Sequence, residues 1–163
     1  MVNVIVYGRG KYAQTEEGVR DLIDDVMTNL EQRVVDSSGY ETVPECASFC
    51  IVEGKYPEET DKRHADNCLY VSVNTRDSYG ALRWWSTQAP TDEAEADVCQ
   101  FVWTSVSSNP PSFDPLLVKD PGSGECYPRG AAIPIAQLRE AVEEFCRNRT
   151  GKRPQCIEWQ LLD

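Results

Sequence analysis

The segment 131–161 constrains the fold most, because its local signals agree along its whole length. Apolar residues recur in it at spacings of three, four and seven, which places them on one side of a helix that must cover a sheet. These residues are Ile135, Leu138, Ala141, Val142 and Phe145. Pro134 suits the first helical turn, Gly151 ends the helix and Pro154 prevents its continuation. The segment therefore predicts a helix with a defined start and stop.

The residues after Pro154 predict a terminal strand. The sequence from Cys156 to Leu161 alternates with period two, so Ile157, Trp159 and Leu161 share one face. We expect Trp159 to pack beneath the apolar stripe of the preceding helix.

A second amphipathic helix is predicted near the N-terminus. Its apolar stripe consists of Val19, Leu22, Ile23, Val26, Met27, Leu30 and Val34. Thr15 is suited to cap this helix, and Glu16 and Glu17 fall in the first turn, where acidic residues are favoured. The opposite side carries acidic residues that we interpret as a solvated face: Asp21, Asp24, Asp25 and Glu31.

The remaining apolar runs predict strands separated by short polar turns. Residues 2–7 form a β-branched run that Gly8 ends, and Gly8 to Gly10 is expected to be a loop without the spacing of a phosphate-binding motif. The other candidates are residues 47–52, 68–73, 79–86, 98–106 and 116–118. The connection 74–78 is short enough for a hairpin, which indicates an antiparallel meander. We predict a single α+β domain spanning 1–163, with an antiparallel sheet of about five or six strands and two helices packed on one face.

Charge narrows the possible partners. The 163 residues contain 27 acidic and 16 basic side chains, for a net charge of −11. Such a field repels nucleic acid and anionic membranes and speeds encounter with a basic protein. The alternative is that the acidity serves only solubility.

Cysteine usage and hydropathy predict a location. Seven cysteines is an odd number without framework spacing, which favours free and mostly buried thiols in a reducing compartment. We see no leader of signal-peptide type and no apolar run of membrane length. We therefore expect a cytoplasmic protein.

Two cysteine-containing pairs could suggest zinc. Cys46 precedes Cys50 by four residues, and His64 precedes Cys68 by four. If 47–52 is a strand, residues four apart lie roughly 13 Å from each other, too far to share one ion. We predict no metal and no other cofactor.

Catalysis is also disfavoured. His64 is the only histidine and falls in a charged segment, whereas a catalytic histidine needs a fixed tautomer and a dry pocket. An enzyme centred on His64 or on the Cys46, Cys50 and Cys68 group remains the alternative to a non-catalytic protein.

One segment suggests a protein-binding surface. Trp84 and Trp85 are adjacent in a predicted strand, so they point to opposite faces and only one joins the main core. They precede an acidic run of four carboxylates, Asp92, Glu93, Glu95 and Asp97. An exposed tryptophan beside such a cluster is typical of a partner-binding patch. The alternative has both tryptophans buried, one on each sheet face, and a loop that only aids solubility.

Several motifs resemble one bacterial immunity-protein family, the first numbered immunity family of polymorphic toxin systems. The family is common in actinobacteria and often encoded beside nucleic-acid deaminase toxins. The likeness covers roughly the last half of the chain and rests on the helix opened by Ile-Pro, Tyr79 to Trp85, Asn109 to Pro111, Thr150 to Pro154, and Trp159-Gln160.

The resemblance implies an immunity protein, or antitoxin, that binds a cognate toxin with a basic surface. The toxin is expected to be a nucleic-acid deaminase or nuclease, and the inhibition to work by occlusion of its active site or substrate groove. A non-catalytic adaptor domain is a second alternative.

Overall fold

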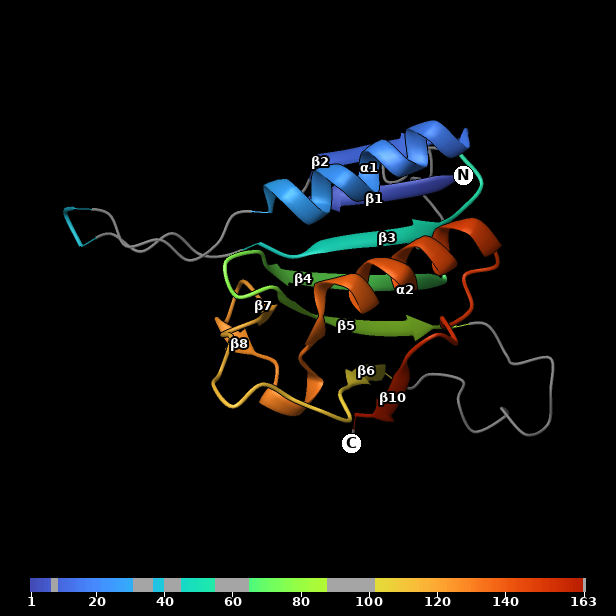
Figure 1. Cartoon of the computed structure of the whole chain (residues 1–163). Coiled ribbons are helices and arrows are strands. Elements are labelled where there is room, and N and C mark those ends of the chain that lie inside the picture. The colour runs from blue at the N-terminus through green and yellow to red at the C-terminus, as the bar shows by residue number, and fades with distance from the viewer. Residues whose placement is uncertain (7–8, 31–36, 40–44, 55–64, 88–101, 163) are drawn as a thin grey trace.

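The computed structural model describes residues 1–6, 9–30, 37–39, 45–54, 65–87 and 102–162. Both long helices lie on the same face of one large sheet (Figure 1). This arrangement confirms the predicted α+β class with two helices on one face.

The sheet has eight strands, more than the five or six expected, in the order β10-β6-β5-β4-β3-β1-β2 with β9 paired to β5. All of its strand pairs are antiparallel. Its strands are β1 Val2–Val6, β2 Arg9–Ala13, β3 Ala47–Ile51, β4 Asn67–Asn74, β5 Tyr79–Ser86, β6 Val102–Val106, β9 Ile133–Pro134 and β10 Glu158–Leu161.

Two of these strands were not predicted. Strand β2 includes part of the expected loop and has no β-branched residue, yet it pairs along its length with β1. Strand β9 is two residues long, and its Pro134 lies opposite Tyr79 of β5. Pro134 is therefore the residue that precedes the helix and not part of its first turn.

The candidate strand 116–118 is displaced. Leu116 is exposed with a positive φ of 51°, and β7 (Val118–Asp120) begins two residues later. It pairs with β8 (Glu125–Cys126) in a separate two-stranded sheet, and the short 3₁₀ helix η2 (Arg129–Ala131) follows.

Helix α1 (Glu16–Asn29) begins where the sequence predicts. The Thr15 side chain accepts a 3.1 Å hydrogen bond from the Gly18 amide, which satisfies one of the free donors at the helix start. The buried stripe consists of Val19, Leu22, Ile23, Val26 and Met27. Leu30 caps the C-terminal end and is also buried, whereas Val34 and Glu31 lie outside the described residues.

Helix α2 (Ile135–Asn148) buries Leu138, Ala141, Val142 and Phe145, as predicted. It lies so close to β5 that a Cβ on Gly80 would meet Leu138 Cδ2 at 2.4 Å. The helix ends before Gly151, because Arg149 adopts a left-handed conformation with φ of 52°. Gly151 has a positive φ too, and it packs against Asn67.

Strand β10 starts at Glu158, two residues later than predicted, and forms one edge of the sheet. Trp159 is half-buried there and contacts the main core, and its indole Nε1 donates to the Pro154 carbonyl at 2.8 Å. Helix α2 lies over β4 and β5, nearer the middle of the sheet (Figure 1).

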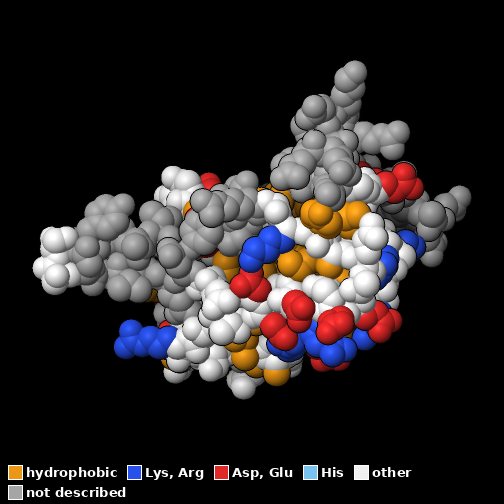
Figure 2. Space-filling view, turned by 90° about the horizontal axis from the view of Figure 1, so that it is seen from above, with side chains coloured by type: hydrophobic (Ala, Val, Ile, Leu, Met, Phe, Trp, Pro, Cys, Tyr) orange, Lys and Arg blue, Asp and Glu red, His pale blue; other side chains and the backbone are white. Residues whose placement is uncertain are grey.

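The charged side of the helices is partly neutralised by ion pairs. Lys11 pairs with Asp25, and Arg139 pairs with both Asp24 and Glu143. Figure 2 shows acidic and basic side chains intermingled over the visible face, with apolar side chains between them. The acidic side of α1 is therefore a solvated surface of mixed charge.

Candidate partner-binding surface

Trp84 and Trp85 occupy opposite faces of β5. Trp84 is 7% exposed and belongs to the main core under the helices. Its indole Nε1 donates a 2.9 Å hydrogen bond to the Gly151 carbonyl. Trp85 is half-buried on the other face, where it packs against the cluster of Cys50, Ala65 and Cys68. It is therefore neither the exposed tryptophan of the binding-patch interpretation nor the fully buried one of the alternative.

The residues after α2 hold this core region in place. The Arg153 guanidinium lies 3.9 Å from the centre of the Trp103 ring and 6.0 Å from that of Trp84. A Cβ on Gly151 would approach Asn67 to 2.5 Å. The segment from Thr150 to Pro154, which carries part of the family resemblance, thus packs against the sheet.

The face opposite the helices carries three side chains of the types that concentrate binding energy, Tyr70, Arg83 and Trp85. We call these three residues the Arg83 patch. Tyr70 and Arg83 are register partners in β4 and β5, and the guanidinium carbon lies 4.4 Å from the centre of the Tyr70 ring. Burial raises the pKa of Tyr70, and a hydrogen bond with the Trp85 side chain opposes that rise.

Two hydroxyl groups beside the patch have no hydrogen-bond partner among the described residues. Thr104 of β6 lies opposite Arg83 in register and is 5% exposed. Tyr127 is 3% exposed, and its hydroxyl is also without a partner. Burial raises the pKa of Tyr127, and the positive charge of Arg83 opposes the rise, which places Arg83 within electrostatic reach of that ring.

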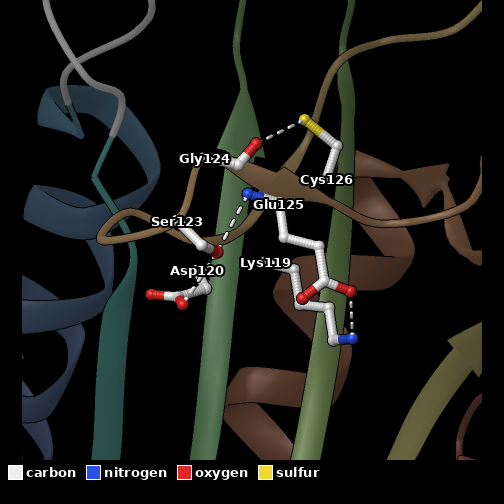
Figure 3. Close-up of polar contacts among 6 residues, drawn as sticks. All are labelled: Lys119, Asp120, Ser123, Gly124, Glu125 and Cys126. Atoms are coloured by element: carbon white, nitrogen blue, oxygen red, sulfur yellow. Dashed lines mark hydrogen bonds and ion pairs between the residues drawn. The ribbon is translucent and has the colours of Figure 1, made fainter.

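The β7–β8 hairpin lies in front of β4 and β5, on the side away from α2 (Figure 3). Its carboxylates are engaged within the hairpin. Lys119 pairs with Glu125 at 2.6 Å, and Asp120 accepts hydrogen bonds from the Gly122 amide and the Ser123 hydroxyl. Neither acid of the hairpin lies within ion-pair distance of Arg83. The hydrogen bond from Ser123 and, to a smaller extent, the positive charge of Arg83 lower the pKa of Asp120, so this carboxylate is within electrostatic reach of Arg83.

The cysteines that suggested zinc are divided between two places. Cys50 and Cys68 are buried neighbours, with Sγ atoms 3.6 Å apart, whereas Cys46 donates to the Val118 carbonyl. Among the described residues, no group of three or more histidine, cysteine or acidic side chains is placed to hold a metal ion. His64 lies outside the described residues, so the absence of zinc stays a prediction.

Burial and hydrogen bonding raise the pKa of four cysteine thiols. The hydrogen bond with Cys50 and burial raise the pKa of Cys68 well above its usual value, and burial raises that of Cys46 to about 12. Burial also raises the pKa values of Cys146 and Cys156 to about 12. Because the thiolate is the reactive form, these shifts favour the protonated, less nucleophilic form of the four side chains near neutral pH.

The acidic run cannot be placed relative to this surface. Asp92, Glu93, Glu95 and Asp97 all lie outside the described residues, so their role in partner binding stays a prediction. Tyr70 and Arg83 were not predicted as site residues. The alternation of β5 does place Arg83 on the same face as Trp85, but the neighbouring residue of β4 depends on strand register.

A groove of about 670 Å³ separates the start of α1 from the end of α2. Its lining includes Arg20, Arg147 and Arg149 together with Glu16 and Glu143, over an apolar floor. Arg149 donates to the Gln14 carbonyl at 2.7 Å. The groove carries both signs of charge, unlike the Arg83 patch.

No helix in the described parts of the chain has the length and apolarity needed to cross a membrane.

Comparisons with known proteins identify the family. No curated protein matches the sequence at a significant level. The family model described as "Immunity protein Imm1" matches residues 8–161, nearly the whole chain and not only the half that carries the motifs. The chain therefore belongs to the Imm1 family of immunity proteins.

Proposed function

We propose that this chain binds a cognate polymorphic toxin and inhibits it by occlusion, without catalysing a reaction. The observation that carries the proposal is the family match over residues 8–161, which supports an immunity role. The raised pKa values of Cys46 and Cys68 favour a binding role over the enzyme alternative, because a protonated thiol is a poor nucleophile.

The toxin is a nucleic-acid deaminase or nuclease with a basic substrate groove. Its substrate is polyanionic, and the net charge of −11 suits this chain to compete for the same groove. The complex forms in the cytoplasm, where such a toxin meets its substrate.

Co-expression tests the proposal. The first step is to identify a toxin gene beside the gene of this chain, and its toxin domain is then produced in cells with and without the chain. We expect the intact chain to restore growth, and we expect purified chain to abolish toxin activity at an equimolar ratio. Growth arrest that persists despite soluble, folded chain would contradict the proposal and favour an adaptor role.

The enzyme alternative has its own control. His64→Ala, Cys50→Ala and Cys68→Ala variants that fold should protect cells as well as the unmodified chain. Protection lost on replacing His64, with toxin binding retained, would indicate chemistry and would contradict inhibition by occlusion.

A further inference from the structure

We propose that the toxin docks on the sheet face opposite the helices, where Arg83 binds a toxin carboxylate and Trp85 contacts an apolar toxin side chain. This inference rests on the proposed function and specifies its binding surface. It assigns a local chemistry to the contact, an acidic toxin side chain next to an apolar one, within the otherwise basic toxin face that the net charge of −11 attracts.

The first argument is the unpaired charge of Arg83. Arg83 is half-buried, its guanidinium carbon lies over the Tyr70 ring, and no carboxylate in the described ranges forms an ion pair with it. The negative charge of Asp120 acts on Arg83 only from beyond ion-pair distance. A carboxylate that binds the guanidinium directly therefore adds strong, bidentate hydrogen bonds that the described chain does not supply. A guanidinium that stacks through its flat face also keeps its N–H donors free for such a partner.

The second argument is the hydrogen-bonding capacity around that charge. The hydroxyls of Thr104 and Tyr127 are buried without partners in the described structure, although most buried polar atoms are paired. Both groups are neutral, so neither offsets the charge of Arg83. A carboxylate that arrives at Arg83 brings an acceptor to this group of donors.

The third argument is the rigidity of the aromatic anchors. Tyr70 and Trp85 belong to adjacent central strands, each paired on both sides. Behind them, Trp84 is held by its hydrogen bond to Gly151. Anchors that are already ordered lose little side-chain entropy on binding, so more of the contact energy appears as affinity.

The face of the sheet that carries the helices is a weaker candidate for the docking surface. Its ion pairs join Lys11 to Asp25 and Arg139 to two acids, so these charges are already compensated. Arg20 and Arg147 in the helix-end groove are exposed and therefore remain hydrated. Arg83 differs from them because it is both half-buried and unpaired within the described residues.

The test measures binding of a catalytically inactive form of the adjacent toxin domain. We expect Arg83→Gln and Trp85→Ala each to weaken affinity about 30-fold or more, mainly through faster dissociation. Arg83→Lys should be intermediate, because lysine keeps the charge but loses the planar fork. Arg147→Gln is the matched control, which removes one exposed arginine from the helix side and should leave affinity unchanged. Melting curves identify any variant that fails to fold.

A second measurement uses the unmodified chain and does not depend on variants. Hydroxyl-radical oxidation of Tyr70 and Trp85 should fall when the toxin domain is bound, while oxidation of half-buried Trp159 should not change. Unchanged oxidation of Tyr70 and Trp85, or wild-type affinity of a folded Arg83→Gln variant, would overturn this inference and leave the proposed function intact. If the unmodified chain does not bind the toxin, both this inference and the proposed function are wrong.

Discussion

The indole nitrogen of Trp84 donates a hydrogen bond to the carbonyl of Gly151, 67 residues later in the chain. This contact joins the centre of the sheet to the segment after α2. The alternation of β5 places the neighbouring Trp85 on the opposite face, so Trp84 belongs to the main core while Trp85 is half-buried away from it.

Trp84→Phe should destabilise the protein by about 1–3 kcal/mol, because the buried Gly151 carbonyl loses its donor. Urea unfolding followed by circular dichroism measures this change. Toxin affinity of the folded fraction should stay the same, since Trp84 does not reach the surface. Unchanged stability would mean that this carbonyl finds another donor.

Gly80→Ala should lower stability by about 1–3 kcal/mol, because a Cβ there meets Leu138 Cδ2 at 2.4 Å and the Ser72 carbonyl at 2.7 Å. Gly130→Ala is the matched control, since its Cβ would meet nothing within 4 Å. Thermal melting of the two variants should therefore differ clearly. Equal melting temperatures would indicate that α2 lies farther from β5 than described.

Trp159→Ala should destabilise the protein less than Trp84→Ala. Burial of Trp159 is only partial at the edge strand β10, whereas truncation of a fully buried tryptophan typically costs about 3–5 kcal/mol. Parallel urea titrations of the two variants compare these costs. A larger effect at Trp159 would show that β10 contributes more to the core than its edge position suggests.

The ion pair between Lys11 and Asp25 should make the free energy of unfolding depend on pH in the acidic range. The hydrogen bond from Lys11, followed by that from Asn29, lowers the pKa of Asp25 below its ordinary value of 3.8. A lowered pKa stabilises the folded state above the unfolded-state value, and this contribution is lost as pH falls through the folded-state value. Lys11→Met should therefore reduce the loss of stability between about pH 6 and about pH 3. The effect is small because the pair is exposed, and an identical pH profile for the variant would contradict it.

Neutralising Asp92, Glu93, Glu95 and Asp97 to Asn or Gln should slow toxin association and flatten its dependence on salt, with less effect on dissociation. The control neutralises four exposed acids elsewhere, Glu17, Asp21, Glu53 and Glu140, and so removes the same charge. Association rate constants at about 0.05 M and about 0.3 M salt distinguish an effect of these four acids from an effect of the total charge of the chain. Equal slowing in both variants would mean that only the total charge matters.

The sequence alone determined the features that depend on neighbouring residues. The Thr15 cap and apolar stripe predict α1, the 74–78 turn predicts the β4–β5 hairpin, and strand alternation separates Trp84 from Trp85. Each of these signals is complete within a short segment, because helix and strand periodicity are local properties of the backbone.

Only the tertiary structure decided how distant segments meet. The residues of β2 have a weak intrinsic preference for a strand, and β2 forms because it pairs with the edge of β1 that does not face β3. Pro134 joins the sheet because it lies opposite Tyr79 of β5. The Arg83 patch depends on the register that places Tyr70 beside Arg83, and a shift of one residue would turn every side chain of a strand to the other face. Register is set by contacts between strands, so no pattern within β4 or β5 alone could reveal that patch.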